Sequence, residues 1–373
     1  MLTALHNLLL INGGTITRGK AVLVKEEKIT GVVNENDIPA EAKRIDLHDC
    51  YLAPSFIDLQ VYGSGGKLFG GKYLEDALQQ MESDFIEQGT TGFLATIGTN
   101  TPEVFEQAIL AAKSYGDHSK GNFLGLHLEG PFINPLRKGA HDEKLIRKAT
   151  LAEVKRWVEM GEGVIKMMTL APELQDSEVI DYLTESDVVI AAGHSNATYE
   201  DAKGFLNKSI PAVTHLYNAM PQMHHREPGF IPAIFEEKPY TSIVADGVHV
   251  DFAMVRLAKR ELGDKLYLIT DSVTNSSDGA YHHEFKGTHY VMQPHGTLSG
   301  SCLTMLRAVQ NCVEHADINL AEAINMATLY PSQLMKLNKG RIAEGLDADL
   351  VAFDKDYQVR AVMLTGNLLT NRT

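Results

Sequence analysis

Apolar runs and amphipathic segments alternate along the middle of the chain. Runs such as GFLATIG are typical of a buried strand, whereas YLEDALQQMESDFIEQG carries apolar residues every three to four positions and predicts a helix with one apolar face. Regular alternation of the two kinds implies parallel βαβ units, and eight such units close a (β/α)8 barrel. We expect the eight strands in FIDLQVYG, GFLATIG, FLGLHLEG, VIKMMTLAP, VVIAAGHS, AVTHLYNA, TSIVADG and LYLITDSV.

The two ends of the chain show a different pattern of short β-rich runs. In AVLVKEEKITGVV, a charged KEEK segment separates two β-branched runs, which predicts a hairpin. Residues 340–373 show the same pattern of short β-rich runs as residues 1–52. Because neither end is long enough to bury a sheet alone, we predict that 1–52 together with 340–373 form a small β-sandwich domain. Residues 53–339 then form the α/β barrel.

Length, charge and cysteine content narrow the class of protein. The 373 residues accommodate one barrel of ~250 residues and a smaller domain. A formal net charge of −14 argues against nucleic acid or an anionic membrane surface as a partner. The three cysteines give no disulfide framework, and the N-terminal run MLTALHNLLL lacks the basic start of a signal peptide. We therefore expect a protein of the cytoplasm.

Five residues that can bind a metal or transfer a proton follow the predicted strands in order: Glu129, His194, His215, His249 and Asp271. Strand ends converge on one mouth of a (β/α)8 barrel, so these side chains are expected to form one site. Glu129, His194 and His215 offer one oxygen and two nitrogens, which suits a catalytic zinc or ferrous ion with one position open for water. Asp271 has the type and place of a general base that accepts the water's proton and returns it to a leaving amine.

Spacing alone leaves alternatives open for several of these residues. His249 can donate a hydrogen bond to a developing oxyanion, but a histidine of a surface loop fits the pattern nearly as well. The alternative for Glu129 is a capping or salt-bridging carboxylate, although HLEGPF places it between a strand and a Gly-Pro break where no helix needs a cap. The histidine pairs at 224–225 and 282–283 look like metal-binding dipeptides, but their polar surroundings favour solvent-exposed side chains.

Nine short motifs occur along the chain in a specific order: HLEGPF, KGAH, TLAPE, GHSNA, THLYNAM, REPG, DGVH, TDS and GTLSGS. In this set the chain resembles the N-acetylglucosamine-6-phosphate deacetylases of the amidohydrolase superfamily, over nearly its whole length. The resemblance implies a hydrolase of amino-sugar metabolism that cleaves the acetamide of an amino-sugar 6-phosphate to acetate and the free amine, with a metal-bound water as nucleophile. It also implies that Glu129, His194 and His215 hold the metal, that Asp271 is base and acid, and that His249 contacts the substrate carbonyl.

The resemblance extends to residues that bind the substrate. It implies this role for His141 and for the pair Asn218 and Ala219. It further implies that Arg226 binds the phosphate, and in such enzymes this arginine can come from the neighbouring subunit of a homodimer. The forked donors of a guanidinium suit a phosphate, and a local cation answers the need of an acidic protein that binds an anion.

The first predicted strand departs from the superfamily pattern. Most members carry His-x-His there as ligands of a second metal, whereas FIDLQVYG offers Gln60 and Tyr62. We therefore expect one divalent ion per subunit, Zn²⁺ or Fe²⁺. Lys166 invites comparison with the carboxylated lysine that bridges two metals in other members, but its place inside VIKMMTLAP favours an ordinary lysine.

Two other functions remain as alternatives. The first keeps the chemistry and changes the substrate to N-acetylgalactosamine 6-phosphate, or to a cyclic amide as in the dihydroorotase branch, which Asn218 and Arg226 disfavour. The second is a catalytically silent scaffold with the amidohydrolase fold. A scaffold has no need of a base at the last strand, so Asp271 argues against it. The configuration at C4 of the sugar and the identity of the metal stay open.

Overall fold

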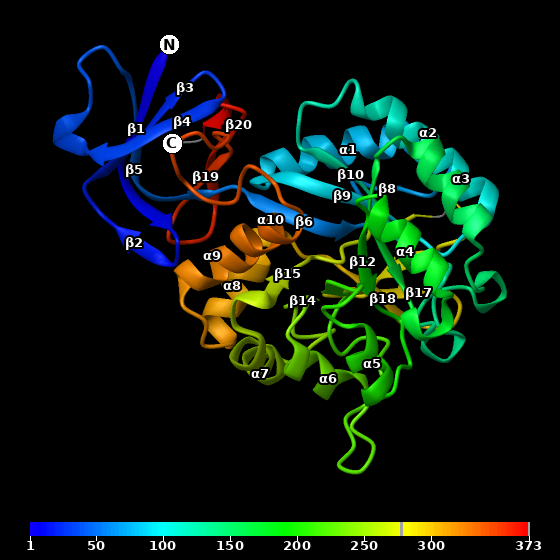
Figure 1. Ribbon diagram of the computed structural model, residues 1–373. Coiled ribbons are helices and arrows are strands. Elements are labelled where there is room, and N and C mark those ends of the chain that lie inside the picture. Colours follow the sequence, from blue (N-terminus) through cyan, green and yellow to red (C-terminus); the bar gives the residue numbers. More distant parts are fainter. Residues whose placement is uncertain (277–278, 372–373) are drawn as a thin grey trace.

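Eight parallel strands close into a barrel that forms the body of the protein (Figure 1). The computed structural model describes residues 1–276 and 279–371. The strands lie in the order β15-β14-β13-β12-β11-β10-β9-β6. Closure comes from the backbone of Asp271 and Tyr62, whose amides donate to the carbonyls of Gln60 and Ser272 at 3.0 and 2.9 Å. The strands are β6 (Phe56–Val61), β9 (Thr90–Gly98), β10 (Phe123–Glu129), β11 (Ile165–Leu170), β12 (Val189–Ala192), β13 (Ala212–Val213), β14 (Tyr240–Ile243) and β15 (Leu266–Leu268).

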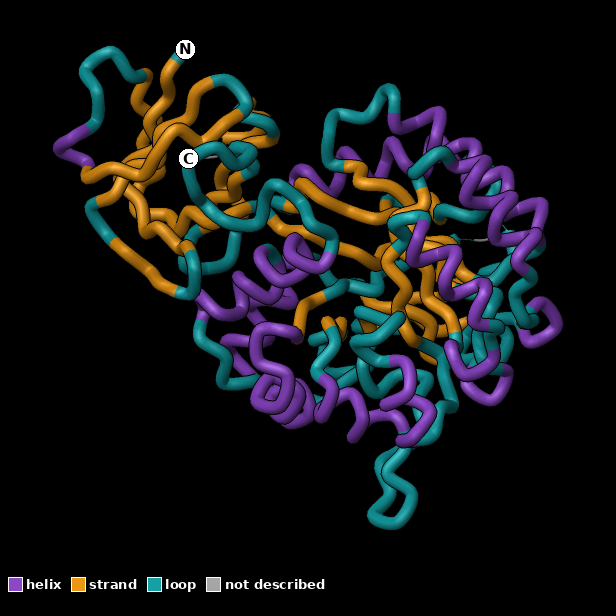
Figure 2. The backbone as a smooth tube through the Cα atoms, viewed as in Figure 1, coloured by secondary structure: helices purple, strands orange, loops and turns teal. Residues whose placement is uncertain are grey.

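Helices surround the barrel, as Figure 2 shows. The outer helices are α1 (Leu74–Glu87), α2 (Pro102–Gly116), α3 (Leu151–Gly161), α4 (Ser177–Glu185), α5 (Tyr199–Phe205), α6 (Phe230–Glu237) and α7 (Phe252–Leu262). Three more helices follow the last barrel strand, namely α8 (Met305–His315), α9 (Leu320–Ala327) and α10 (Leu329–Leu334). Short 3-10 helices are η1 (Glu35–Asp37), η2 (Pro135–Arg137), η3 (Glu143–Leu145), η4 (Pro172–Leu174) and η5 (Gly263–Lys265). The predicted fold class is confirmed.

Local sequence explains why these elements form. Every residue of β6 and β9 is buried, as expected for parallel strands that are covered on both faces. At the start of α2 the Thr101 side chain caps the first turn and Pro102 occupies the first helical position. Between α2 and α3, the buried Trp157 ring stacks on Phe105 and Phe132 at centroid distances of 4.8 and 5.4 Å.

The two ends of the chain share one β-sheet beside the barrel, and both termini lie in this part of the molecule (Figure 1). Its strands are β1 (Leu2–Asn12), β2 (Thr15–Thr17), β3 (Lys20–Lys25), β4 (Lys28–Asn34), β5 (Lys43–Pro54), β19 (Leu350–Phe353), β20 (Val359–Leu364) and β21 (Asn367–Asn371). The antiparallel pair β5 and β19 joins the N-terminal part to the C-terminal part. Leu5, Val22 and Leu52 pack with Leu350 and Met363 in a separate core. The domain limits at 52, 53, 339 and 340 stay a prediction.

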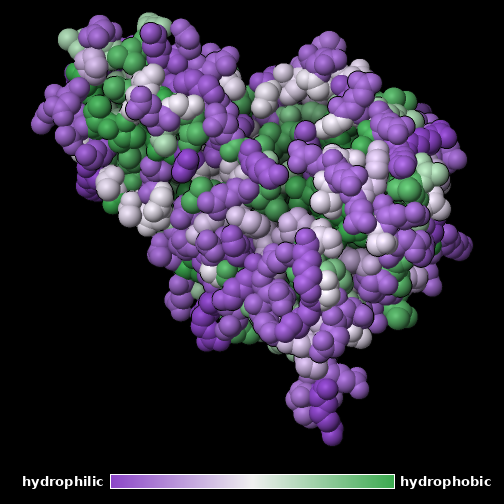
Figure 3. Space-filling view, viewed as in Figure 1, coloured by the Kyte–Doolittle hydropathy of each residue, from purple (hydrophilic) through white to green (hydrophobic). Residues whose placement is uncertain are grey.

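An antiparallel excursion separates the last barrel strand from α8. It comprises β16 (His283–Phe285), β17 (His289–Met292) and β18 (Thr297–Ser301), and an isolated bridge between Ser272 and Ser301 ties it to the barrel. A smaller pair, β7 (Gly63–Ser64) and β8 (Lys67–Leu68), follows β6. Among the described residues no helix has the length and apolar character needed to cross a membrane. Figure 3 shows a mainly hydrophilic face with hydrophobic atoms gathered in the recess between the small sheet and the barrel.

Candidate active site

Three ligand-capable atoms converge at the carboxyl ends of the barrel strands. Glu129 ends β10, and His194 and His215 follow β12 and β13 by two residues. The Nε2 atom of His215 lies 3.0 Å from Glu129 Oε1 and 3.1 Å from His194 Nε2, and His194 Nε2 lies 3.4 Å from the same Oε1. Ligands of a tetrahedral ion at about 2.0–2.1 Å are about 3.3 Å apart. The spacing of these buried atoms therefore fits a divalent metal.

Hydrogen bonds outside the cluster set the orientation of His194. Its Nδ1–H donates to the carbonyl of Arg137 at 2.7 Å, so a neutral ring directs the lone pair of Nε2 toward Glu129. The His215 Nδ1 atom is buried and has no partner among the described residues. Burial raises the pKa of Glu129, but contacts with the side chains of His141, His194 and His215 outweigh burial and hold its pKa well below the usual range. A charged carboxylate is the form that binds a cation.

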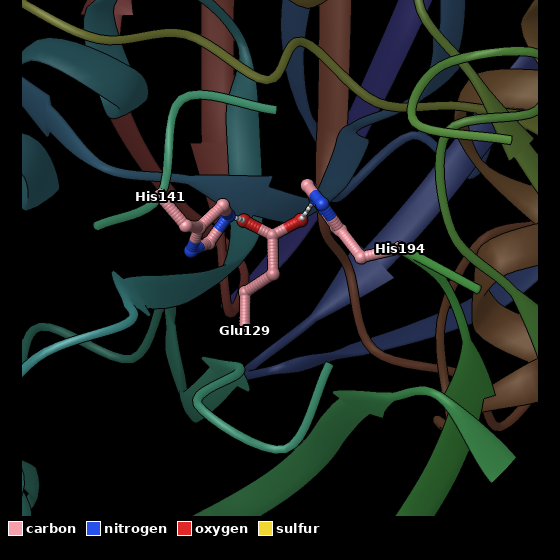
Figure 4. A group of neighbouring side chains, drawn as sticks. All are labelled: Glu129, His141 and His194. Carbon is pink, nitrogen blue, oxygen red and sulfur yellow. Dashed lines mark ion pairs between the residues drawn. The ribbon is translucent and has the colours of Figure 1, made fainter. Parts of the chain in front are cut away.

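His141 lies on the other side of the Glu129 carboxylate, as Figure 4 shows. Its Nε2 is 3.4 Å from Glu129 Oε2. One ligand atom from each of Glu129, His141 and His194 also lies close enough to the others to hold a metal ion. The Nδ1 atom of His141, however, accepts a hydrogen bond from the backbone amide of Thr99 at 3.2 Å. A neutral ring that accepts at Nδ1 carries its proton on Nε2. In that state His141 is a hydrogen-bond donor to the carboxylate and has no lone pair for an ion.

Asp271 follows the last barrel strand and faces the cluster. The side-chain amide of Gln60 donates to Asp271 Oδ1 at 2.9 Å and to Glu129 Oε1 at 3.0 Å. The Tyr62 hydroxyl donates to the other oxygen of Glu129. Burial and the nearby charge of Glu129 raise the pKa of Asp271 well above its usual range, which makes its carboxylate a stronger base. Of the two residues that stand in place of His-x-His, Gln60 is therefore hydrogen-bonded to both acidic groups and Tyr62 to Glu129.

The side chain of His249 is buried rather than exposed on a surface loop. Its side chain is 6% exposed, and Nδ1 lies 2.6 Å from Asp246 Oδ2 while Nε2 lies 3.8 Å from Asp271 Oδ2. Burial raises the pKa of Asp246, but the interaction with the His249 side chain and the hydrogen bonds from the Val248 and His249 amides together outweigh burial and lower the pKa. Sequence reasoning missed Asp246, although its spacing of three residues before His249 in DGVH was a usable signal.

A cavity of about 260 Å³ contains nearly all of the predicted site residues. Those that line it are Glu129, His141, His194, His215, Asn218, Ala219, His249 and Asp271. Residues that were not predicted also line it, among them Asn100, Tyr281, His283 and Ser299. Asn100 follows β9, and the others belong to the excursion after β15, whose return to the barrel mouth has no signature in the local sequence.

Arg226 is the predicted site residue that does not line the cavity. It belongs to an exposed run, 222–228, in the loop between β13 and α6 that projects from the body in Figure 1. The interpretation of the pair 224–225 as solvent-exposed is confirmed. For the pair 282–283 it is correct for His282 and wrong for His283, which is 8% exposed because β16 turns it toward the cavity. Lys166 lines a different cleft.

Comparisons with known proteins define the class to which this fold and site belong. A family model described as "Amidohydrolase family" matches residues 51–369, and the chain belongs to this family. Its relatives include an N-acetylglucosamine-6-phosphate deacetylase from Haemophilus influenzae, 33% identical over 99% of both chains. An N-acetylgalactosamine-6-phosphate deacetylase from a Shewanella species is 32% identical over 95% of this chain and 93% of its own. The expectation of a hydrolase is confirmed.

Solved structures of N-acetylglucosamine-6-phosphate deacetylases are similar to this chain over its whole length. A crystal structure of N-acetylglucosamine-6-phosphate deacetylase from Pasteurella multocida superposes with a TM-score of 0.94 at 31% identity and covers all of both chains. The Mycobacterium smegmatis deacetylase, solved as a mutant in complex with N-acetyl-D-glucosamine-6-phosphate, has a TM-score of 0.91 at 29% identity and covers 100% of this chain and 99% of that one. The resemblance that the nine motifs indicated is confirmed.

Proposed function

We propose that the protein hydrolyses the acetamide of N-acetylglucosamine 6-phosphate to glucosamine 6-phosphate and acetate. The observation that carries the proposal is one cavity that holds a cluster of ligand atoms 3.0–3.4 Å apart together with the carboxylate of Asp271. The deacetylases among the relatives match this chain over nearly its full length, which supports the choice of reaction. The three cysteines are free, which supports a cytoplasmic location.

The proposed metal ligands are Glu129, His194 and His215, with one ion per chain. Their donor set of one oxygen and two nitrogens accepts Zn²⁺ or Fe²⁺. A bound divalent ion supplies Lewis acidity, which activates water and polarises an amide carbonyl. A second ion is not expected, because the side chains of Gln60 and Tyr62 are hydrogen-bonded to Glu129 where a second set of imidazoles would stand.

Asp271 is the proposed base and acid of the reaction. Its carboxylate accepts the proton of the attacking water and then returns it to the leaving amine. Asp246 accepts the Nδ1 proton of His249 and fixes the plane of the ring. A ring that also carries a proton on Nε2 can donate to the developing oxyanion. His141, Asn218 and Ala219 complete the proposed substrate contacts from the cavity wall.

The proposed phosphate ligand is Arg226 from a second copy of the chain in a homodimer. The described residues that line the cavity include neither lysine nor arginine, although the substrate carries a phosphate dianion. Arg226 lies instead in the exposed loop that projects from the body. A loop of this kind can reach the cavity of a partner, where a guanidinium binds a phosphate through two parallel hydrogen bonds.

The experiment that tests the function is release of acetate from purified protein loaded with Zn²⁺ or Fe²⁺. We expect turnover of N-acetylglucosamine 6-phosphate, loss of turnover after chelation, and recovery when the metal is returned. The Shewanella relative keeps N-acetylgalactosamine 6-phosphate as a second candidate substrate, so kcat/KM is measured for both epimers. A metal-loaded protein without activity on either sugar would support the silent scaffold instead.

A further inference from the structure

One wall of the cavity is built by the excursion that follows the last barrel strand. Tyr281 and His283 at its start, and Ser299 in β18, all line the cavity. The Tyr281 hydroxyl donates to the carbonyl of Thr99 at 2.8 Å, and His283 Nδ1 lies 2.9 Å from Ser299 Oγ. These bonds fix the wall both to the barrel and within the excursion.

His283 offers an uncommitted polar atom to the cavity. The residue is 8% exposed, and its Nε2 atom has no hydrogen-bond partner among residues 1–276 and 279–371. The atom is not fully enclosed, and His283 lines the cavity. Burial lowers the pKa of His283 to about 4, so the ring is neutral near pH 7. A neutral imidazole suits a hydroxyl group better than a phosphate dianion.

A series of ring contacts separates His283 from the metal cluster. The His283 ring stacks on Tyr281 with centroids 5.9 Å apart and an interplanar angle of 11°. Tyr281 contacts His141 at 6.3 Å, and His141 contacts His194 at 4.5 Å. His283 is therefore three ring contacts from His194. None of the described contacts joins His283 directly to the cluster, so we place it against the remainder of the substrate rather than the acetamide.

We propose that His283 is a specificity-determining residue, which recognises a hydroxyl group of the sugar ring through Nε2 while Ser299 holds its Nδ1. The inference rests on the proposed function, because it takes the sugar phosphate as the ligand. A hydroxyl both donates and accepts, so it pairs with either tautomer of the ring. A substrate that lacks this hydroxyl leaves the buried nitrogen without a partner, and a site of this kind rejects such a substrate.

The test compares N-acetylglucosamine 6-phosphate with analogues that each lack one ring hydroxyl, at C1, C3 or C4. We expect wild type to lose on the order of 10-fold to 100-fold in kcat/KM for one of the three analogues. In His283→Phe, which keeps a planar ring against Tyr281, this penalty should fall to about threefold or less. His283→Gln keeps a side-chain donor and acceptor and should retain most of the penalty. His282→Phe, at the exposed neighbour, should match wild type.

Unchanged metal content and melting temperature in each variant establish that the comparison concerns recognition rather than folding. Hydroxyl penalties in His283→Phe that all equal those of wild type would overturn the proposal. A selective loss toward phosphorylated over unphosphorylated sugar, with the hydroxyl penalties intact, would also overturn it and assign His283 to the phosphate. If metal-loaded wild type turns over no sugar phosphate, both this inference and the proposed function are wrong. Turnover with unaltered penalties contradicts the role of His283 alone.

Discussion

A buried ion pair joins the small sheet to the barrel, and its removal has a cost that can be measured. The Asp349 side chain is fully buried and that of Lys339 is 9% exposed. The Lys339 ammonium contacts Asp349 Oδ2 and donates to the carbonyl of Thr91 in β9 at 3.1 Å. Asp349 also accepts hydrogen bonds from the Thr91 hydroxyl at 3.2 Å and from the Thr365 amide at 2.7 Å. One carboxylate thus connects segments of both sheets.

We predict that Lys339→Met destabilises the fold by about 3–5 kcal/mol, the usual cost of leaving one charge of a buried pair without its partner. Methionine keeps much of the apolar stem, so the loss reports mainly on the charge. An unfolding entropy of roughly 2.1 cal/mol/K per residue gives about 0.8 kcal/mol/K for 373 residues. A loss of about 4 kcal/mol then lowers the melting temperature by about 5 °C. Adding Asp349→Asn removes the isolated charge, so the double variant should recover most of the loss.

Urea and thermal denaturation, followed by circular dichroism, measure these differences. Lys336→Met is the matched control, because Lys336 and its partner Asp187 are 83% and 94% exposed at a distance of 3.7 Å. An exposed pair of this kind contributes about 0–1 kcal/mol, so the control should behave nearly as wild type. A loss below about 1 kcal/mol in Lys339→Met, or a double variant no more stable than the single one, would refute the reasoning.

Three further predictions concern the barrel and its site. Burial raises the pKa of Asp58 to about 6 from an ordinary 3.8, so its contribution to stability is present below pH ~4 and is lost as pH rises through 6. Asp58→Asn should therefore gain about 2–3 kcal/mol relative to wild type between pH 4 and pH 7 in urea denaturation. A difference that stays constant with pH would contradict this. His194→Asn should lose most of its metal, as measured by elemental analysis. Asp271→Asn should keep its metal, while its kcat falls by on the order of 10²–10⁴. Equal metal loss in the two variants would argue against separate roles for the two residues. Arg226→Ala should lower kcat/KM for the phosphorylated sugar by on the order of 10-fold to 100-fold and hardly change kcat/KM for the unphosphorylated sugar. Mixing this variant with Asp271→Asn should restore activity in mixed dimers. No recovery despite subunit exchange would place Arg226 in the site of its own chain.

The barrel and its strand ends could be predicted because each strand carries its signal locally. An apolar run buried on both faces marks a strand wherever its neighbours lie. Glu129 ends such a run, His194 and Asp271 follow theirs within two or three residues, and barrel geometry then brings the ends together. The resemblance of motifs added His141 and Asn218, for which local pattern gives no reason.

Other parts of the site depend on contacts that local sequence does not encode. His283 was assigned to solvent because its neighbours in sequence are polar, yet the pairing of β16 with β17 directs it into the cavity. Tyr281 reaches the mouth through a hydrogen bond with Thr99, which lies 182 residues earlier. The role proposed for Arg226 depends on a second chain. Features that depend on long-range strand pairing or on the association of two chains therefore cannot be predicted from local sequence.

The orientation of the site residues also cannot be predicted from the alternation of side chains along a strand. Side chains of a strand alternate between two faces, but His194, His215 and Asp271 have φ values of 48°, 35° and 52°, in the left-handed region. Glu129 ends its strand and precedes Gly130, which has a φ of 83°. At all four positions the chain thus leaves the extended conformation at or directly after the functional residue. A non-glycine residue there carries backbone strain of about 1 kcal/mol or more, which the surrounding barrel must hold in place. The same turn releases the side chain from the alternation of its strand and lets four separate strands direct their polar groups at one point.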